Sequence, residues 1–354
     1  MAADPPPSLA AIGRRVAARI DALLDTEQQR WAVVDADLEE AFAALRVLIA
    51  GGKRLRPAFC HWGFVGAGGD PDDPGIVDAG AALELLHTFA LVHDDIMDNS
   101  VSRHGVACLH VDFADRHRQR GWRGEARRFG DGAAILIGDL AFVYADVLLR
   151  GAPAAALDVF TELRVEVNVG QYLDLVGTAS REASLAQAHT ICVYKSGKYT
   201  IERPLHLGAA LAVDGPPAAD LEKAFTAYGL PLGEAFQLRD DLLGAFGDGH
   251  LLGKGVGEDL RDGKPTALFA IARQRATGAD AILLEDRVGQ PDLTDTEVGD
   301  IQRILTDTGA RATVEEAVAT LTAEALRALA DAPITAAARD ELEALALFVA
   351  ARDF

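Results

Sequence analysis

Two acidic clusters, His93–Asp98 and Gln237–Asp241, contain the side chains best suited to chemistry. Each cluster ends a long apolar stretch that has the composition of a helix. Residues four apart share one face of a helix, so we expect Asp94 and Asp98 to project together. Carboxylates held that close repel one another unless a cation lies between them. Oxygen ligands of this kind suit Mg²⁺, which proteins hold through a few carboxylates together with substrate phosphates. We therefore predict that the two clusters face each other and enclose magnesium ions and a diphosphate.

Basic side chains elsewhere could complete such a site. The segment Gly51–Pro57 has three cations behind two glycines. The glycines permit a tight turn, and Lys and Arg donate charge-assisted hydrogen bonds to phosphate oxygens. Glycine weakens a helix, so Gly197 within Tyr194–Tyr199 indicates a bend or a close approach by substrate. The other candidate groups are Arg103, His104, Lys254 and Lys264. Each alone is typical of ordinary surface, but together with the acidic clusters they form the pattern expected of a metal–diphosphate site.

Two histidines allow more than one interpretation. His87 lies seven residues before Asp94, which places it two turns away on the same helix face. It is either a hydrogen-bonded core residue or a ligand-binding group, and the spacing alone leaves both open. His93 directly before Asp94 is also compatible with a histidine–aspartate metal phosphohydrolase. That class needs further histidine ligands, and no others stand at suitable positions.

The composition favours helices and argues against a nucleic-acid partner. Of the 354 residues, 49% are hydrophobic and only 6% are aromatic, and Ala and Leu, which favour helices over sheet, dominate. The formal net charge of −20 would repel a polyanion. The three cysteines lack metal-ligand spacing, which predicts reduced structural thiols.

The start of the chain is predicted to be disordered and to carry no export signal. Residues 1–8 are Pro-rich and lack the basic start and apolar run of a signal peptide. The apolar stretch Gly80–Val92 is too short to span a bilayer. We therefore expect a cytoplasmic protein without a membrane span.

The spacing of apolar residues predicts one all-helical domain over residues 9–354. No strand alternation, internal repeat or linker between two cores is evident. The segment 112–132 is rich in Arg and is predicted as a surface loop or lid. The predicted helices are 9–24, 32–49, one that Pro57 opens, 76–98, 133–150, 155–176, 184–212, one from 218 to the second acidic cluster, and Ala-rich helices over the remainder of the chain.

In these motifs the sequence resembles the trans-isoprenyl diphosphate synthases (polyprenyl synthetases). The resemblance covers most of the chain and keeps the family's order of motifs. Five ordered motifs are much more specific than one Asp-rich motif. They are GGKxxRP at Gly51–Pro57, DDxxD at Asp94–Asp98, GQxLD at Gln171–Asp174, the Lys-Thr element at Lys195 and Ser196, and the second Asp-rich motif at Phe236, Gln237, Asp240 and Asp241.

The resemblance implies a fold, a reaction and a set of partners. The fold would be an isoprenoid-synthase-type bundle of antiparallel helices around a central cavity, usually in a homodimer. The reaction would be the Mg²⁺-dependent head-to-tail condensation of isopentenyl diphosphate with an allylic diphosphate (dimethylallyl, geranyl or farnesyl). Three Mg²⁺ ions are expected.

The resemblance also implies roles for particular residues. Asp94, Asp98 and Asp240 would hold the metals, with support from Asp95 and Asp241. The allylic diphosphate would be bound by Arg103, Lys195, Lys254 and Lys264. Ser196, next to Lys195, and Gln237 of the second Asp-rich motif would also bind substrate. Isopentenyl diphosphate would be bound by Lys53, Arg56 and His87, with His104 nearby. We expect the catalytic residues to be Asp94, Asp98, Asp240 and Lys195.

The sequence departs from the family pattern at three positions. His104 stands where the family has a second arginine, and it is mostly neutral near pH 7 unless a diphosphate raises its pKa. Gly244 stands where many relatives have a third Asp, although geranylgeranyl-type members commonly lack it. Pro265 stiffens the loop between Lys264 and Thr266.

Product length in this family depends on side chains just before the first Asp-rich motif. Phe89 lies five residues before Asp94 and the small Ala90 lies four before it. A bulky residue only at the fifth position resembles short-chain geranylgeranyl synthases, whereas farnesyl synthases often have a second aromatic residue. Phe89 could equally be ordinary core packing.

Three other functions are weighed against a geranylgeranyl diphosphate synthase. A farnesyl diphosphate synthase differs only in product length. A class I terpene cyclase usually has an Asn/Asp–Ser–Glu second metal motif, which Asp240-Asp241 does not match. A non-catalytic subunit that modulates a partner synthase tends to lose one acidic cluster, and both persist here.

Overall fold

The computed structural model describes residues 4–103, 105–180, 184–213, 215, 217–247, 257–290 and 292–351, and these residues are almost entirely helical. In these ranges the only strands are β1 (Ser102–Arg103) and β2 (Val106–Ala107), which pair antiparallel. The helices are α1 (Pro7–Trp31), α2 (Leu38–Ile49), α3 (Leu55–Gly66), α4 (Pro74–Met97), α5 (Leu109–Gln119), α6 (Ala126–Leu148), α7 (Ala154–Ser180), α8 (Leu185–Ile191), the π-helix η1 (Cys192–Glu202), α9 (Arg203–Ala212), α10 (Ala219–Phe246), α12 (Glu258–Asp262), α13 (Ala267–Arg275), α14 (Gly278–Arg287), α15 (Asp295–Asp307), α16 (Ala310–Ala330) and α17 (Ala336–Ala351).

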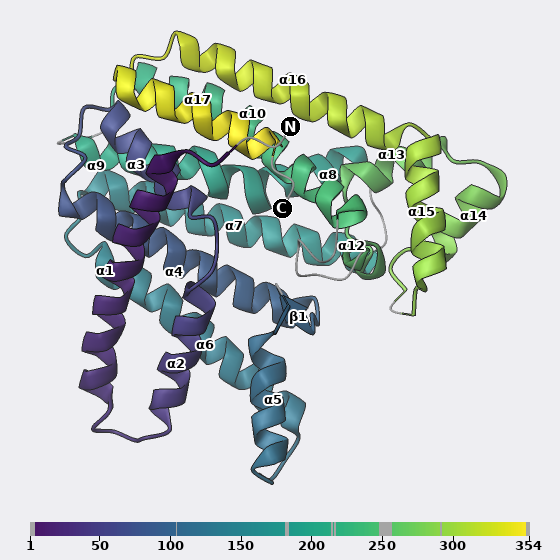
Figure 1. Ribbon diagram of the computed structural model, residues 1–354, viewed down its shortest axis with the longest axis horizontal. Coiled ribbons are helices and arrows are strands. Elements are labelled where there is room, and N and C mark those ends of the chain that lie inside the picture. Colours follow the sequence, from purple (N-terminus) through teal and green to yellow (C-terminus); the bar gives the residue numbers. More distant parts are fainter. Residues whose placement is uncertain are drawn as a thin grey trace.

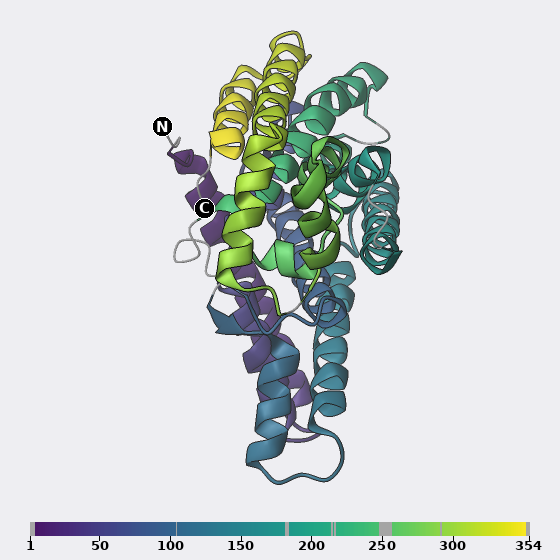
Figure 2. The same cartoon turned by 90° about the vertical axis from the view of Figure 1, so that its right-hand side faces the viewer.

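Long helices stack on one another around α4 and α7, which cross the middle of the molecule (Figure 1). Helix α4 packs on α3 and α6, α7 packs on η1 and α9, and α10 packs on η1 and α16. The α1–α2 hairpin and the α5–α6 hairpin extend to the same lower end, which the side view also shows (Figure 2). The functional residues therefore come from helices that meet near the centre.

Helix α1 confirms the predicted apolar face and corrects its ends. Its buried residues are the six that the helical spacing selects, from Leu9 to Leu24. The helix runs on to Trp31, so the predicted helix over 32–49 begins only at Leu38. It also starts at Pro7, inside the segment predicted as disordered, because proline suits a first helical turn. The Ser8 hydroxyl donates to Glu341 (2.6 Å) and ties this start to α17.

Helix α4 is the buried helix that the apolar stretch predicts. Asp73 caps its start by accepting a hydrogen bond from the backbone of Gly75 (2.7 Å). The helix has 24 residues, more than the predicted apolar stretch, and is long and apolar enough to cross a membrane by length and composition. However, 61% of its most apolar window is buried inside the fold, as in the core helix of a globular domain. The argument against a membrane span therefore rests on burial and not on length.

The Arg-rich segment 112–132 is helical over most of its length, so the prediction of a loop was wrong there. It forms most of α5 and the start of α6, joined by an exposed turn. Ion pairs within and beside the helices explain this order: Arg116 contacts Asp112, one turn away, and Glu40 of α2. The prediction that this segment lies on the surface holds for most of its side chains.

The predicted helix over 184–212 is not uniform, because its middle is the π-helix η1. Glycines let η1 lie directly against two neighbours. A methyl group on Gly170 of α7 would meet the backbone nitrogen of Lys195 at 2.3 Å, and one on Gly233 of α10 would meet the Cα of Gly197 at 2.6 Å. Gly197 thus serves a close approach of two helices, where the sequence had indicated a bend or an approach by substrate.

The buried apolar residues form two clusters that share helices. The larger cluster involves α1–α7, α9 and α17, and the smaller one lies among α13–α15. Helices α10 and α16 contribute residues to both clusters. This continuity supports the proposal that residues 9–354 form one domain.

Candidate active site

Three carboxylates converge at the centre of the molecule. Asp94 and Asp98 come from the C-terminal end of α4 and Asp174 comes from α7, and one oxygen of each lies within 4.8 Å of the others. The predicted pairing of Asp94 with Asp98 is confirmed, since α4 continues as far as Met97 and Asp98 caps it. An all-oxygen donor set of this size fits a hard divalent cation such as Mg²⁺.

Cations from distant parts of the chain surround these carboxylates. Lys195 of η1 lies between two of them, with Nζ 3.0 Å from Asp94 Oδ1 and 2.5 Å from Asp174 Oδ2. The Nζ of Lys264 is 3.1 Å from Asp98 Oδ2. The predicted substrate-binding lysines Lys195 and Lys264 therefore both reach the predicted metal ligands.

Arg103 connects the acidic cluster to the short hairpin that follows α4. Its Nε and Nη2 donate to Asp95 Oδ1 (2.9 and 2.7 Å), and Nη2 is 3.3 Å from Asp94 Oδ2. Gln171 donates to Asp94 Oδ1 from α7 (3.0 Å). Asp95 is buried and orients Arg103, while Asp94 and Asp98 gather with Asp174.

The pKa values of Asp94 and Asp98 are shifted in opposite directions by their surroundings. Burial by itself would raise the pKa of Asp94, but Lys195 and Lys264 outweigh it and hold that pKa well below its usual range. The pKa of Asp98 is raised, first by burial and then by the negative charge of Asp94, although Lys264 opposes the shift. A metal ion beside both carboxylates would relieve this repulsion, which is a second reason why the site suits a cation.

A second group of polar side chains lies beside the same π-helix. The ring of Tyr199 faces the guanidinium of Arg56, with 4.2 Å from Cζ to the ring centre. The Tyr199 hydroxyl is 2.8 Å from His87 Nδ1, and Arg56 Nη2 donates to Thr200 Oγ1 (3.0 Å). The structure therefore brings the predicted pair Arg56 and His87 together through Tyr199.

Two features of this group of side chains suit an anionic ligand. Burial, followed by the charges of Arg56 and Arg103, holds the pKa of His87 well below its usual value, so its ring is neutral near pH 7. The Nε of Arg56 is buried and has no hydrogen-bond partner within the described residues. A buried guanidinium donor without a partner is costly unless a ligand accepts from it.

The second acidic cluster occupies the last turns of α10. Asp240 is exposed, and Asp241 is buried and accepts a hydrogen bond from Gln237 (2.7 Å). Neither joins the three carboxylates described above, so their metal-binding roles stay predictions. Lys53 and Ser196 are half-buried. The predicted residues His104 and Lys254 lie outside the described residues.

Three residues of the site had no role predicted from the sequence, although each lies in a segment that the sequence singles out. Asp174 and Gln171 stand three apart on one helix face, and this spacing was the available signal. Tyr199 is the last residue of the segment Tyr194–Tyr199, which the sequence singles out because of Gly197. Its contact with His87 depends on packing between η1 and α4 that no local spacing reveals.

With this geometry established, comparison with known proteins assigns the family. The family model described as polyprenyl synthetase matches residues 39–306. The chain belongs to the polyprenyl synthetase family. It is a prenyltransferase of the trans-prenyl diphosphate synthase type, as the ordered motifs predict.

Individual relatives of this polyprenyl synthetase agree with the assignment. It is 33% identical over 272 residues to the short chain isoprenyl diphosphate synthase of Methanothermobacter thermautotrophicus, covering 75% of this chain and 77% of the relative. It is 31% identical over 277 residues to the geranylfarnesyl diphosphate synthase of Aeropyrum pernix, covering 76% and 80%.

A solved structure extends the agreement to three dimensions. A geranylgeranyl pyrophosphate synthase from Corynebacterium glutamicum, crystallised with isoprenyl diphosphate and magnesium, matches with a TM-score of 0.91 and 36% identity. The match covers 97% of this chain and 99% of that one. The prediction of an all-α isoprenoid-synthase fold is thereby confirmed.

We predict that Asp174→Asn weakens metal binding, because the substitution removes the third carboxylate of the cluster. The Mg²⁺ concentration for half-maximal activity should rise by at least about tenfold, since even indirect supports of metal ligands are typically worth that much. Asp158→Asn, an exposed change on the same helix, is the control. An unchanged Mg²⁺ dependence in Asp174→Asn would remove this residue from the metal site.

Proposed function

We propose that this prenyltransferase condenses isopentenyl diphosphate with an allylic diphosphate to give a short-chain all-trans product, geranylgeranyl diphosphate. The observation that carries the proposal is the pair of polar subsites that both contact η1. One has clustered carboxylates with Lys195, and the other has Arg56 with His87 and no acidic cluster. A reaction of two diphosphates, only one of which must ionise, needs this asymmetry.

In the proposal, the acidic subsite holds the allylic diphosphate. Asp94, Asp98 and Asp174 hold Mg²⁺ from one side, and Asp240, supported by Asp241, completes a set of three ions from α10. Lys195, Arg103 and Lys264 donate to the phosphate oxygens, as their positions beside the carboxylates allow. Magnesium, when bound, supplies positive charge that stabilises the departing diphosphate.

The subsite of Arg56 and His87 holds isopentenyl diphosphate in this proposal. Arg56 has a buried Nε free to donate, and Lys53 lies in the turn just before α3. The neutral His87 contacts Tyr199 through Nδ1, which leaves Nε2 for the ligand. These residues orient the double bond of isopentenyl diphosphate toward the allylic carbon. The charge of the departing allylic diphosphate is stabilised in the other subsite.

The chemistry then needs no nucleophilic side chain. Lys195 and Arg103 stabilise charge as the allylic C–O bond breaks, and apolar walls keep water from the allylic cation. The double bond of isopentenyl diphosphate attacks that cation and forms the new C–C bond. The departed diphosphate then accepts the proton whose loss restores a double bond.

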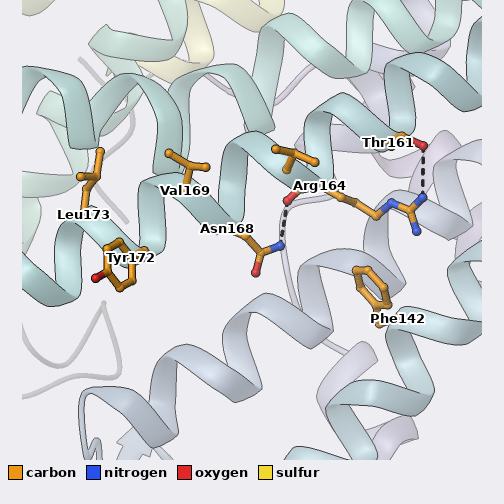
Figure 3. Close-up of a pocket in the computed structure, with 8 residues that line it drawn as sticks. Phe142, Thr161, Arg164, Asn168, Val169, Tyr172 and Leu173 are labelled. Atoms are coloured by element: carbon orange, nitrogen blue, oxygen red, sulfur yellow. Dashed lines mark hydrogen bonds between the residues drawn. The ribbon is translucent and has the colours of Figure 1, made fainter.

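Aromatic contacts support a short product. The ring of Phe89 lies 4.7 Å from that of Phe142 of α6 and 4.5 Å from that of His93, centre to centre. Phe142 also borders an open pocket of about 570 Å³. The other lining residues are Thr161, Arg164, Val165, Asn168, Val169, Tyr172 and Leu173 of α7 (Figure 3). Phe89 and Phe142 together would close the chain-binding cavity before this pocket, and the small Ala90 favours geranylgeranyl over farnesyl diphosphate.

The exposed faces of α6 and α7 support the proposal of a homodimer. On α6, Phe129, Leu136 and Val143 recur every seven residues and are exposed. On α7, Val165, Val169, Tyr172 and Val176 follow helical spacing and are exposed as well. Globular proteins seldom leave such an apolar face uncovered, which points to a second copy of the chain as its partner.

We also propose that the protein is cytoplasmic. Burial of α4 inside the fold supports a protein without a membrane span. Isopentenyl diphosphate and the smaller allylic diphosphates are water-soluble substrates that such a protein meets directly.

The function is tested by incubating the protein with Mg²⁺, isopentenyl diphosphate and each allylic starter, and then sizing the products. We expect geranylgeranyl diphosphate, and we expect Asp94→Ala to lower turnover by at least about a hundredfold because a metal ligand is lost. Asp300→Ala, an exposed change on α15, should behave as wild type. A cyclic hydrocarbon formed without isopentenyl diphosphate would refute the proposal, as would near-normal turnover of Asp94→Ala.

For product length, we predict that Phe89→Ala lengthens the product by at least one isoprene unit, because it opens part of the cavity floor. Phe89→Ala with Phe142→Ala should lengthen it further, since both rings would then be gone from the entrance to the pocket. Trp122→Ala, in the exposed turn after α5, is the control for loss of an aromatic ring. An unchanged product distribution in the double variant would reject the floor assignment.

For the dimer, we predict that Leu136→Glu yields a monomer, measured by sedimentation equilibrium. A charge at the centre of an apolar interface cannot be solvated there. Ile282→Glu on α14 is the matched control, because Ile282 is 63% exposed and Leu136 is 66% exposed. A dimer that persists in Leu136→Glu, or a wild-type monomer, would contradict the assigned interface.

A further inference from the structure

A buried carboxylate outside both subsites contacts two cations at once. Glu166 of α7 accepts from Lys198 of η1, and from Nε and Nη2 of Arg203 at 2.6 and 2.7 Å. Only 5% of Glu166 is exposed. Burial would raise its pKa, but Arg203 and Lys198 outweigh that effect and lower it, so the group is a carboxylate near pH 7. Nothing in the proposed reaction uses this group directly.

The spacing of the two cations identifies the helix type. Lys198 and Arg203 are five residues apart. In an α-helix this separation turns side chains about 140° away from each other, at about 100° per residue. In a π-helix the hydrogen bonds run from residue i to residue i+5, so residues five apart stack on one face. The N–H of Arg203 does bond to the carbonyl of Lys198. A single carboxylate can therefore bind both side chains readily only while this segment keeps its π-helical register.

Glu166 belongs to a line of residues on α7 that faces η1. Glu166, Gly170 and Asp174 are each four apart and share a face. Glu166 binds Lys198 in the middle of η1, Gly170 approaches the backbone of Lys195, and Asp174 binds the ammonium group of Lys195. The π-helix is thus held against α7 at Lys195 and at Lys198, and Arg203 just after η1 is bound by the same Glu166.

Both diphosphate subsites depend on this register. Lys195 reaches the carboxylate cluster, whereas Tyr199 contacts His87 and Thr200 contacts Arg56. A change from π to α geometry would rotate these side chains relative to one another, so they could not all keep their contacts. Glu202 and Glu162 also act on Arg203 through their charge. The nearest charged atoms of Glu202 and Arg203 are 4.0 Å apart, farther than those of Glu166 and Arg203 at 2.6 Å.

We propose that Glu166 is a positioning residue that holds η1 in its π-helical register and thereby sets both diphosphate subsites at once. It acts through Lys198 and Arg203 and touches neither substrate. The kinetic part of this inference rests on the proposed function, while the structural part does not.

The test uses Glu166→Gln, which keeps the size of the side chain and removes its charge. Asp158→Asn is the control, because Asp158 is an exposed carboxylate two turns earlier on the same helix. Hydrogen exchange of the amides of residues 192–202 is measured without metal or substrate. KM and kcat are measured separately for isopentenyl diphosphate and for the allylic substrate.

We expect amide exchange in residues 192–202 to accelerate in Glu166→Gln and not in Asp158→Asn. We expect both KM values to rise by about tenfold or more, since displacements of about 1 Å at a site can have effects of that size. A merely structural role would lower kcat through loss of active protein and leave both KM values unchanged. If Glu166→Gln does not fold, Lys198→Gln is tested in its place, and we expect the same results. The exposed change Lys223→Gln is then the control.

The outcomes separate the inference from the proposed function. Wild-type exchange rates over residues 192–202 overturn the inference, whatever the activity. Faster exchange with either KM unchanged also overturns it. A wild-type protein that forms no prenyl product refutes the proposed function instead, and the exchange result still decides whether Glu166 holds the register.

Discussion

Repulsion between closely held carboxylates is the constraint on which the rest of this structure depends. Asp94, Asp98 and Asp174 meet within 4.8 Å, with Asp174 buried and the other two half-buried. Such a cluster is stable only with positive charge nearby. Lys195, Lys264 and Arg103 supply that charge from three separate parts of the chain. The same groups are well placed to bind phosphate oxygens once metal ions neutralise the carboxylates, so the balance that permits folding also prepares the site.

Helix α7 and the π-helix η1 act together as the frame of the site. One face of α7 contacts η1 through a carboxylate, a glycine and a second carboxylate. Breaking one partner from a buried ion pair is strongly destabilising, because the other charge is left without compensation. Rare backbone geometry such as a π-helix persists where its surroundings hold it, and it is common at functional sites. The wide turn of η1 directs Lys195 to one subsite and Tyr199 to the other.

The apolar surface near Phe89 and Phe142 suits a prenyl product. A growing prenyl chain adds only hydrocarbon, so the surface that receives it must be apolar and must exclude water. Phe89 and Phe142 lie in contact on neighbouring helices, and beyond Phe142 the pocket opens along α7 toward the exposed faces of α6 and α7. In the proposed homodimer, a second copy over these faces would cover the pocket as well and would link assembly to the shape of the proposed chain-binding cavity.

Local spacing in the sequence determined much of this protein. The i, i+4 relation of Asp94 and Asp98 and the buried face of α1 follow from helix periodicity, which depends only on neighbouring residues. The ordered motifs likewise indicated the family and its helical fold. Tertiary structure alone decided that Asp174 joins the cluster, that 112–132 is helical, and that 192–202 is a π-helix. These features depend on contacts between residues far apart in the chain, such as Lys195 with Asp94 and Glu166 with Arg203. Local spacing could place Gln171 and Asp174 on one helix face and pair Arg116 with Asp112. It could not show which distant residues those faces meet, because those contact energies appear only after the helices have packed.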